Sequence, residues 1–201
     1  MHFRTDWRKL VVKILFAISA ALAGLSFSEP SHAADIGAGT VMRVDTRAGI
    51  DVPLYTVWRS DAVATVILFS GGGGGFGKIG EDGWPASSNF LIRTGKLWAA
   101  HPFNVVMVGR PSDGIDLRDG AVRIGENHAA DNRSIFKAVK LKSNLPIWVV
   151  GTSMGTMSAA AAAIQDNEKL VSGVVLRHRA GIRRAILLAV AGALRRCSSS
   201  P

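Results

Sequence analysis

Residues 147–155, which read IWVVGTSMG, decide the fold of this chain. The first four residues are apolar, as is typical of a strand that is buried on both faces. Residues 153–165 are rich in alanine and predict a helix. Gly151 and Gly155 stand two residues before and two residues after Ser153, where a sharp strand-to-helix turn needs small side chains. The stretch therefore predicts a strand, a tight turn at Ser153 and a helix.

Ser153 is the candidate catalytic residue in this turn. A sharp turn at the end of a strand presents a serine hydroxyl at the carboxyl edge of the sheet, clear of its neighbours. The amino terminus of the following helix also favours negative charge that develops during a reaction. The alternative is a tight turn in which Ser153 only caps the helix.

A second motif, SGGGGGFGK at residues 70–78, follows an apolar run at residues 63–69 that predicts a buried strand. Glycine lets backbone N–H groups face a ligand without obstruction by side chains. In acyl transfer that ligand is the oxyanion of the tetrahedral intermediate. As an alternative, residues 72–78 fit the phosphate-binding pattern G-x-x-x-x-G-K, although Ile79 replaces its Ser or Thr. A flexible glycine linker is the third interpretation.

The rest of the chain alternates predicted strands and helices. Strands are expected at residues 40–47, 52–59, 63–69, 103–109, 147–150 and 171–176, and helices at 89–100, 128–142 and 153–165. Several of these strands are apolar throughout. This pattern favours a doubly wound α/β fold, with a mostly parallel sheet and helices on both faces.

This order of elements resembles the α/β-hydrolase family of serine esterases and lipases over roughly residues 40–176. The resemblance implies an incomplete α/β-hydrolase fold that ends after the sixth strand. It implies hydrolysis of a small-molecule carboxylic ester or amide through an acyl-serine at Ser153, without a metal or another cofactor. It also implies an oxyanion hole formed by Gly71, Gly72 and Met154.

The acid and the histidine of that family have no match in this sequence. In the family both follow the serine in chain order. Here the acids after Ser153 are Asp166 and Glu168, in or just past the predicted helix, and the later histidine is His178. Because a serine without its base is a poor nucleophile, the sequence predicts little or no activity. A non-catalytic binding protein on the same scaffold is the alternative.

Four other polar residues are candidates for roles near the site. His128 stands near the start of a predicted helix and His101 precedes a buried strand, so both are expected to be surface or capping histidines. Asp113 and Asp116 follow the strand at 103–109, at the carboxyl edge where α/β proteins bind ligands. They are candidate substrate contacts, and equally candidate turn formers.

The first 33 residues are expected to be a secretory signal peptide, followed by a domain at residues 34–176. Four basic residues precede an apolar run at residues 14–27, and Ser31 and Ala33 stand at the positions that a signal peptidase recognises. The sequence therefore predicts cleavage after Ala33 and a periplasmic or secreted protein. Contact with the membrane is expected only through this peptide.

Residues 177–201 form a basic tail with six arginines and no acid. No strand is predicted there, and the tail is expected to be foreign to the fold, as after a frameshift or a gene truncation. A membrane-seeking helix at residues 182–194 is the alternative. Without further strands, the strand at 171–176 is expected to form an exposed apolar edge.

The net charge of +9 comes from the two ends of the chain. Residues 35–176 carry 14 basic and 13 acidic side chains, so the expected domain is nearly neutral. The high isoelectric point is therefore poor evidence for a nucleic-acid-binding surface, and no nucleic acid partner is expected.

Overall fold

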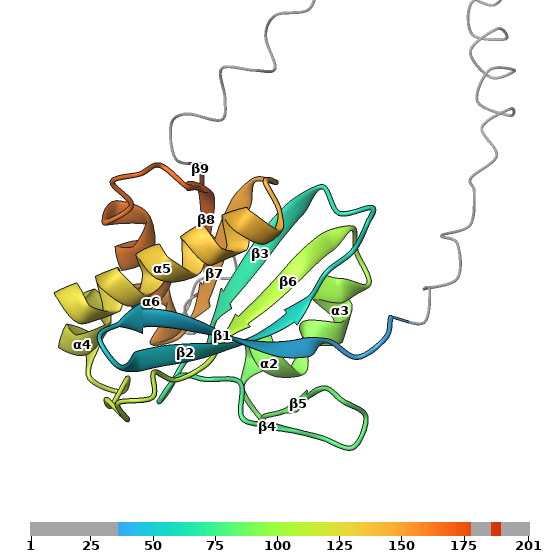
Figure 1. Cartoon of the computed structure of the whole chain (residues 1–201), viewed down its shortest axis with the longest axis horizontal. Helices are drawn as coiled ribbons and strands as arrows, with labels where there is room; N and C mark the ends of the chain where they lie inside the picture. Colours follow the sequence, from blue (N-terminus) through green and yellow to red (C-terminus); the bar gives the residue numbers. More distant parts are fainter. Residues whose placement is uncertain (1–35, 178–185, 190–201) are drawn as a thin grey trace, which may run out of the picture. The chain divides into compact units, whose positions relative to one another are not determined.

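The computed structural model describes residues 36–177 and 186–189. Within these residues the main sheet has seven strands in the order β1-β2-β6-β3-β7-β8-β9 (Figure 1). In chain order they are β1 (Thr40–Arg47), β2 (Ile50–Val57), β3 (Ala64–Phe69), β6 (Phe103–Val108), β7 (Ile147–Thr152), β8 (Val171–Arg177) and β9 (Ile186–Ala189). The four strands β6, β3, β7 and β8 run parallel, and the remaining pairs are antiparallel.

Helices cover both faces of this sheet, and a two-stranded sheet follows the glycine-rich loop. The helices are α2 (Phe90–Arg93), α3 (Gly95–Ala99), α4 (Gly120–Ile124), α5 (Glu126–Lys142) and α6 (Gly155–Ile164), and the small sheet pairs β4 (Lys78–Ile79) with β5 (Pro85–Ala86). Figure 1 shows α4, α5 and α6 grouped together, apart from α2 and α3. None of the described helices is both long enough and apolar enough to cross a membrane.

Each face of the sheet has its own hydrophobic core, and β3 belongs to both. Ile67 and Phe69 pack in the cluster that includes residues of α5 and α6. Val66 and Leu68 pack in the cluster that includes residues of α2 and α3. All six residues of β3 are buried, as a strand between two helical layers must be. The doubly wound, mostly parallel α/β fold is therefore confirmed.

Two local predictions were wrong, and in each case a polar side chain bonds to the backbone where the structure differs from the prediction. The helix expected at 89–100 is interrupted at Thr94, whose hydroxyl donates to the carbonyls of Phe90 and Leu91. The stretch 110–125, expected to be a loop, contains α4. Asp119 caps this helix by accepting a hydrogen bond from the Ala121 N–H at 2.8 Å.

The basic tail also differs from the expectation. No strand was predicted after residue 176, yet β9 pairs antiparallel with β8, with Gly173 opposite Ala189 and Leu176 opposite Ile186. The apolar run at residues 186–189 supplies this strand. Strand β8 is therefore not an exposed edge. Both the predicted signal peptide and the other residues of the tail after Arg177 lie outside the described residues.

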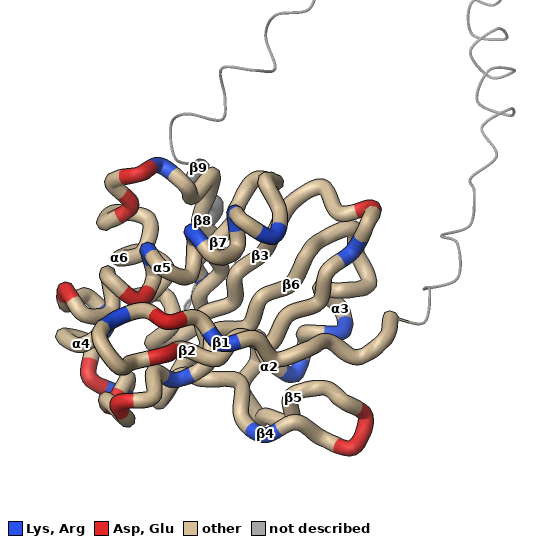
Figure 2. The backbone as a smooth tube through the Cα atoms, in the orientation of Figure 1, with Lys and Arg blue, Asp and Glu red and all other residues tan. Residues whose placement is uncertain are grey.

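Basic and acidic residues are interspersed over the described backbone (Figure 2). This distribution matches the near balance of 14 basic and 13 acidic side chains in residues 35–176.

Helix α6 approaches the carboxyl end of β3 so closely that only glycine fits at its first position. A Cβ on Gly155 would lie 2.0 Å from the carbonyl oxygen of Phe69 and 2.9 Å from that of Ser70. On the other side of the turn, a Cβ on Gly151 would lie 2.3 Å from the carbonyl oxygen of Gly155. Both glycines of the sequence motif are therefore required by backbone packing.

Substitution Gly155→Ala is expected to lower the free energy of unfolding by about 3 kcal/mol or more, because rigid backbone must move to admit the methyl group. Chemical denaturation of the purified variants measures this change. Gly37→Ala is the matched control, since a Cβ at this exposed position would contact nothing within 4 Å. Equal stability of the two variants would contradict the close approach of α6 to β3.

Candidate active site

Ser153 occupies a strained turn between β7 and α6. Its φ angle is 52°, in the left-handed region that a non-glycine residue adopts at a cost of about 1–3 kcal/mol. The turn is held by two backbone hydrogen bonds, from the Ser153 N–H to Arg177 O at 3.2 Å and from the Thr156 N–H to Ser153 O at 2.9 Å. Because the residue is also exposed, its hydroxyl is free to meet a ligand. The predicted tight turn is thus present.

The glycine-rich loop lies directly against this turn. A Cβ on Gly71 would be 3.0 Å from the Cβ of Ser153 and 3.0 Å from the carbonyl oxygen of Thr152. The loop is folded on itself: the Gly74 N–H donates to Gly71 O at 3.2 Å, and the Ser70 hydroxyl donates to Gly75 O at 2.8 Å. These bonds define one conformation, so the loop is a structured turn and not a flexible linker.

The loop does not have the surroundings that a phosphate-binding loop needs. Such a loop leads into a helix whose amino terminus faces the phosphate. Here Lys78 begins the short strand β4, and its side chain is exposed. The nucleotide-binding alternative therefore has no support in the structure.

Both the turn at Ser153 and the glycine-rich loop contain backbone N–H groups without a partner among the described residues. Within the described residues, the N–H groups of Gly72, Gly73 and Met154 have no backbone or side-chain acceptor. Gly72 adopts a positive φ of 59°, and Met154 directly precedes the first residue of α6. The structure thus places Met154 in the turn and Gly71 against it, with Gly72 and Gly73 next along the loop. Their role as an oxyanion hole stays a prediction.

Arg123 supports the loop from behind, and the sequence analysis missed it. This side chain is only 1% exposed, although it comes from the stretch that was expected to be a loop. Its guanidinium donates to Gly72 O at 2.8 Å, to Leu117 O at 2.6 Å and to the Ser158 hydroxyl at 2.7 Å. No carboxylate of the described residues forms an ion pair with it. Burial lowers the pKa of Arg123 to about 10, so the group remains charged at neutral pH.

His128 is buried, so its expected role as a surface or capping histidine was wrong. It is 6% exposed, and its Nε2 lies 3.0 Å from the hydroxyl of Ser158. Because Arg123 can only donate, the Ser158 oxygen accepts from it and directs its own proton to Nε2 of His128. Burial, aided by the positive charge of Arg123, lowers the pKa of His128 to about 4. A neutral imidazole bonded to Ser158 is therefore part of the scaffold.

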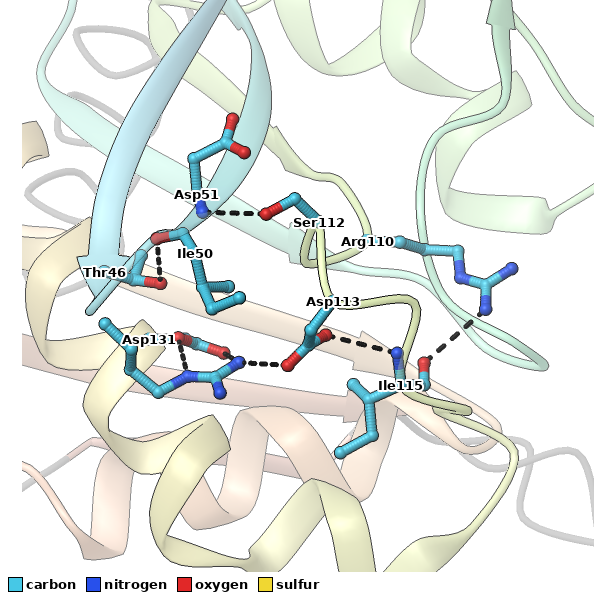
Figure 3. A network of polar contacts seen from close by, with 9 residues as sticks. Thr46, Ile50, Asp51, Arg110, Ser112, Asp113, Ile115 and Asp131 are labelled. Carbon is cyan, nitrogen blue, oxygen red and sulfur yellow. Dashed lines mark hydrogen bonds and ion pairs between the residues drawn. The ribbon is translucent and has the colours of Figure 1, made fainter.

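The two candidate substrate contacts are engaged by other protein groups. Asp113 forms an ion pair with Arg47 at 2.7 Å, and the same guanidinium binds Asp131 at 2.8 Å. Figure 3 labels the two aspartates within this polar network. The hydrogen bond from Arg47 lowers the pKa of Asp113. Asp113 also accepts from the Ile115 N–H at 3.2 Å, and Asp116 accepts from the Arg118 N–H at 3.0 Å. Both side chains thus stabilise turns of the backbone. Their contact with a substrate stays a prediction.

The other titratable candidates have partners away from Ser153. Asp166 accepts from the Val171 N–H at 2.7 Å, and Glu168 forms an ion pair with Lys137 at 2.7 Å. His101 precedes β6, at the amino edge of the parallel strands. His178 lies outside the described residues. Within residues 36–177, no histidine or carboxylate side chain forms a hydrogen bond with Ser153.

An aromatic and a basic side chain flank the turn. Asn89, which lies 3.6 Å from a Cβ built on Gly71, caps α2, and Phe90 follows it with 37% of its surface exposed. The guanidinium carbon of Arg177 lies 4.4 Å from the centre of the Phe90 ring. Since Arg177 O also binds the Ser153 N–H, this pair lies beside the serine.

The strand order, the parallel strands around β3 and the turn at the end of β7 define the class of this protein. Two antiparallel strands lead into a crossed-over parallel sheet, and a serine at a strand-to-helix elbow stands at its carboxyl edge. This is the α/β-hydrolase fold.

Comparisons with solved structures return esterases. A cold-adapted esterase from an Arctic intertidal metagenomic library is 18% identical with a TM-score of 0.46, over 69% of this chain and 58% of that one. Brefeldin A esterase, a bacterial homologue of human hormone-sensitive lipase, is 16% identical with a TM-score of 0.48, over 87% and 49%. An esterase from Rhodococcus sp. ECU1013 is 16% identical with a TM-score of 0.46, over 68% and 44%.

This chain thus spans between 44% and 58% of the length of these three proteins. No protein-family model matches the sequence, and a search of curated proteins finds no match.

Burial of His128 predicts that the free energy of unfolding depends on pH in a specific way. Because the pKa of His128 is about 4 in the folded chain and about 6.5 when exposed, the folded state resists protonation. The resulting stabilisation is present above pH 6.5 and is lost as the pH falls towards 4. At pH 4.5 the loss amounts to about 2.5 kcal/mol relative to pH 7.

Urea denaturation at pH 7 and at pH 4.5 measures this loss. His128→Gln is expected to lose about 2.5 kcal/mol less than the wild type between the two pH values, since glutamine does not titrate. The exposed His101 supplies the control, and His101→Gln is expected to follow the wild type. If His128→Gln and the wild type lose the same stability, the histidine is not buried in its neutral form.

Proposed function

We propose that this protein acts on small carboxylic esters through an acyl-serine formed at Ser153. One observation carries the proposal: an exposed serine with a φ angle of 52° lies against a glycine-rich turn in which, within the described residues, the N–H groups of Gly72 and Gly73 have no protein acceptor. Strain at one residue beside unpaired backbone donors is typical of a site that is arranged for a reaction.

The proposed chemistry follows from the positions of these groups. The Ser153 oxygen adds to the carbonyl carbon of the ester, and the carbonyl oxygen becomes an oxyanion. The N–H groups of Met154 and of the Gly72–Gly73 segment stabilise that oxyanion, each being worth about 3 kcal/mol in such a site. The alcohol then leaves with the proton of the serine hydroxyl, and water later releases the acid from the acyl-serine.

We propose further that the described part of the chain turns over slowly. It supplies the nucleophile and the oxyanion donors, but within residues 36–177 no imidazole is bonded to Ser153 to remove its proton. His128 cannot serve, because its Nε2 accepts the proton of Ser158. Loss of a base costs several orders of magnitude in rate, whereas the oxyanion hole alone retains some activity. An amide, which has a poorer leaving group, is the less suitable substrate.

Labelling with a fluorophosphonate, followed by intact mass spectrometry, tests the nucleophile. Slow labelling of one site per chain is expected, with complete loss in Ser153→Ala. Ser60→Ala is the matched control, because Ser60 is an exposed serine before β3, at the opposite edge of the parallel strands. Ser60→Ala is expected to label like the wild type.

The same experiment separates the proposed function from its alternatives. No labelling at all would favour a non-catalytic binding protein on the hydrolase scaffold. Labelling within seconds that depends on Ser153 would contradict slow turnover and would require a base outside the described residues.

We also propose that the protein is exported to the periplasm or secreted. The support is the basic start, the apolar run at residues 14–27 and the small residues Ser31 and Ala33. Amino-terminal sequencing of the protein recovered from a secreting bacterial host is expected to begin at Ala34. A start at the initiator methionine, with the protein retained in the cell, would contradict export.

A further inference from the structure

We propose that Arg123 is the positioning residue of the oxyanion hole, and that the oxyanion formed at Ser153 supplies the counter-ion that this buried guanidinium lacks. This inference rests on the proposed function and extends it to a residue that does not touch the substrate. Three features of the structure carry it: the hydrogen bond to the loop, the unpaired charge and the neutral network behind it.

The first feature is the contact with the Gly72 carbonyl. The guanidinium of Arg123 donates to Gly72 O at 2.8 Å. In a trans peptide the C=O and the following N–H point in opposite directions, so drawing Gly72 O towards Arg123 turns the Gly73 N–H away from it. The bond from the Gly74 N–H to Gly71 O fixes the preceding peptide as well. Arg123 thereby sets the direction of the Gly73 N–H, while the bond from the Gly74 N–H sets that of the Gly72 N–H.

The second feature is the charge itself. Arg123 is 1% exposed, and within the described residues its three partners are two carbonyls and a hydroxyl, none of them an anion. Asp131 of α5 lines the same small cavity as Arg123, but its carboxylate is already paired with Arg47 at 2.8 Å. A buried cation without a counter-ion is unfavourable in the resting protein and attracts a negative charge that forms nearby.

The third feature is that the network behind Arg123 cannot neutralise it. Ser158 is fully buried, accepts from Arg123 at 2.7 Å and donates to His128 at 3.0 Å. The imidazole is uncharged, because burial lowers its pKa to about 4. Arg123, His128 and Ser158 line one small cavity together with Ser70 and Gly74 of the loop and with Asp131, whose charge is balanced by Arg47. The full positive charge therefore stands behind the oxyanion donors.

Arg123 is expected to stabilise the transition state more than the bound substrate. An ester bound in its ground state has a neutral carbonyl oxygen and gains little from the charge. When the Ser153 oxygen adds to the carbonyl carbon, the electron pair of the C=O bond moves to that oxygen. The oxyanion then interacts with donors whose direction Arg123 fixes and with the charge of Arg123 itself. The residue should thus affect the rate of the chemical step and leave binding unchanged.

Phosphonylation kinetics test this inference, because the phosphonyl oxygen occupies the place of the oxyanion. In Arg123→Met the maximal rate of labelling by the fluorophosphonate is expected to fall at least tenfold, with the half-saturating concentration changed less than twofold. Arg123→Lys keeps the charge but not the fork of donors, and is expected to recover part of the rate.

Arg118→Met is the matched control. Its guanidinium lies 3.8 Å from a Cβ built on Gly73, but its side chain is 77% exposed, so solvent screens its charge. This variant is expected to label within twofold of the wild type. If folded Arg123→Met also labels within twofold of the wild type, or if its loss appears in the half-saturating concentration, the inference is wrong.

A second measurement needs no variant of Arg123 and covers the case in which these variants fail to fold. Nitrogen-15 spectra of the wild-type guanidinium groups are recorded before and after phosphonylation of Ser153. The resonances of Arg123 are expected to shift on adduct formation, and unchanged resonances would overturn the inference. If the wild-type chain is not labelled at Ser153 at all, that result contradicts the proposed function and not only the role of Arg123.

Discussion

The site depends on the contact between the first residue of α6 and the carboxyl end of β3. At Gly155 the helix backbone comes so close to the carbonyls of Phe69 and Ser70 that a methyl group would meet an oxygen at 2.0 Å. This contact holds the turn at Ser153 against the glycine-rich loop that leaves the same strand. Two distant parts of the sequence, the turn at Ser153 and the loop that begins at Gly71, are thereby held side by side.

The helices on the two faces of the sheet keep that contact fixed. β3 is buried on both sides, with α5 and α6 over one face and α2 and α3 over the other. Behind the loop, the hydrogen bonds of Arg123 to Gly72 and Leu117 connect it with the loop at residues 110–119. The strain at Ser153, about 1–3 kcal/mol, is therefore sustained by surroundings that leave the turn no alternative.

The sequence was sufficient for the parts of this arrangement that depend on local patterns. Continuous apolar runs identified the buried strands, and the spacing of Gly151, Ser153 and Gly155 identified the turn, because both are consequences of backbone geometry. Strand β9 was not predicted because its four residues lie in an arginine-rich stretch, where the regular succession of strands and helices seen earlier in the chain is absent.

Long-range polar contacts could not be predicted in the same way. Arg123 stands in a stretch with several turn formers, and nothing local indicates that its guanidinium reaches Gly72, 51 residues away in sequence. His128 looked like an exposed residue near a helix start, and only the packing of α5 against α6 buries it beside Ser158. Charged and titratable side chains acquire their roles from neighbours that the fold supplies, so their environment has to be seen before their chemistry can be inferred.

The central claim is that Ser153 and the glycine-rich loop form one nucleophile and oxyanion site. The most direct test is a crystal structure of the chain after reaction with a fluorophosphonate. The account predicts a phosphorus–oxygen bond at Ser153, with the phosphonyl oxygen about 2.7–3.1 Å from the N–H groups of Met154 and of Gly72 or Gly73. An adduct whose phosphonyl oxygen points into solvent, away from the loop, would contradict it.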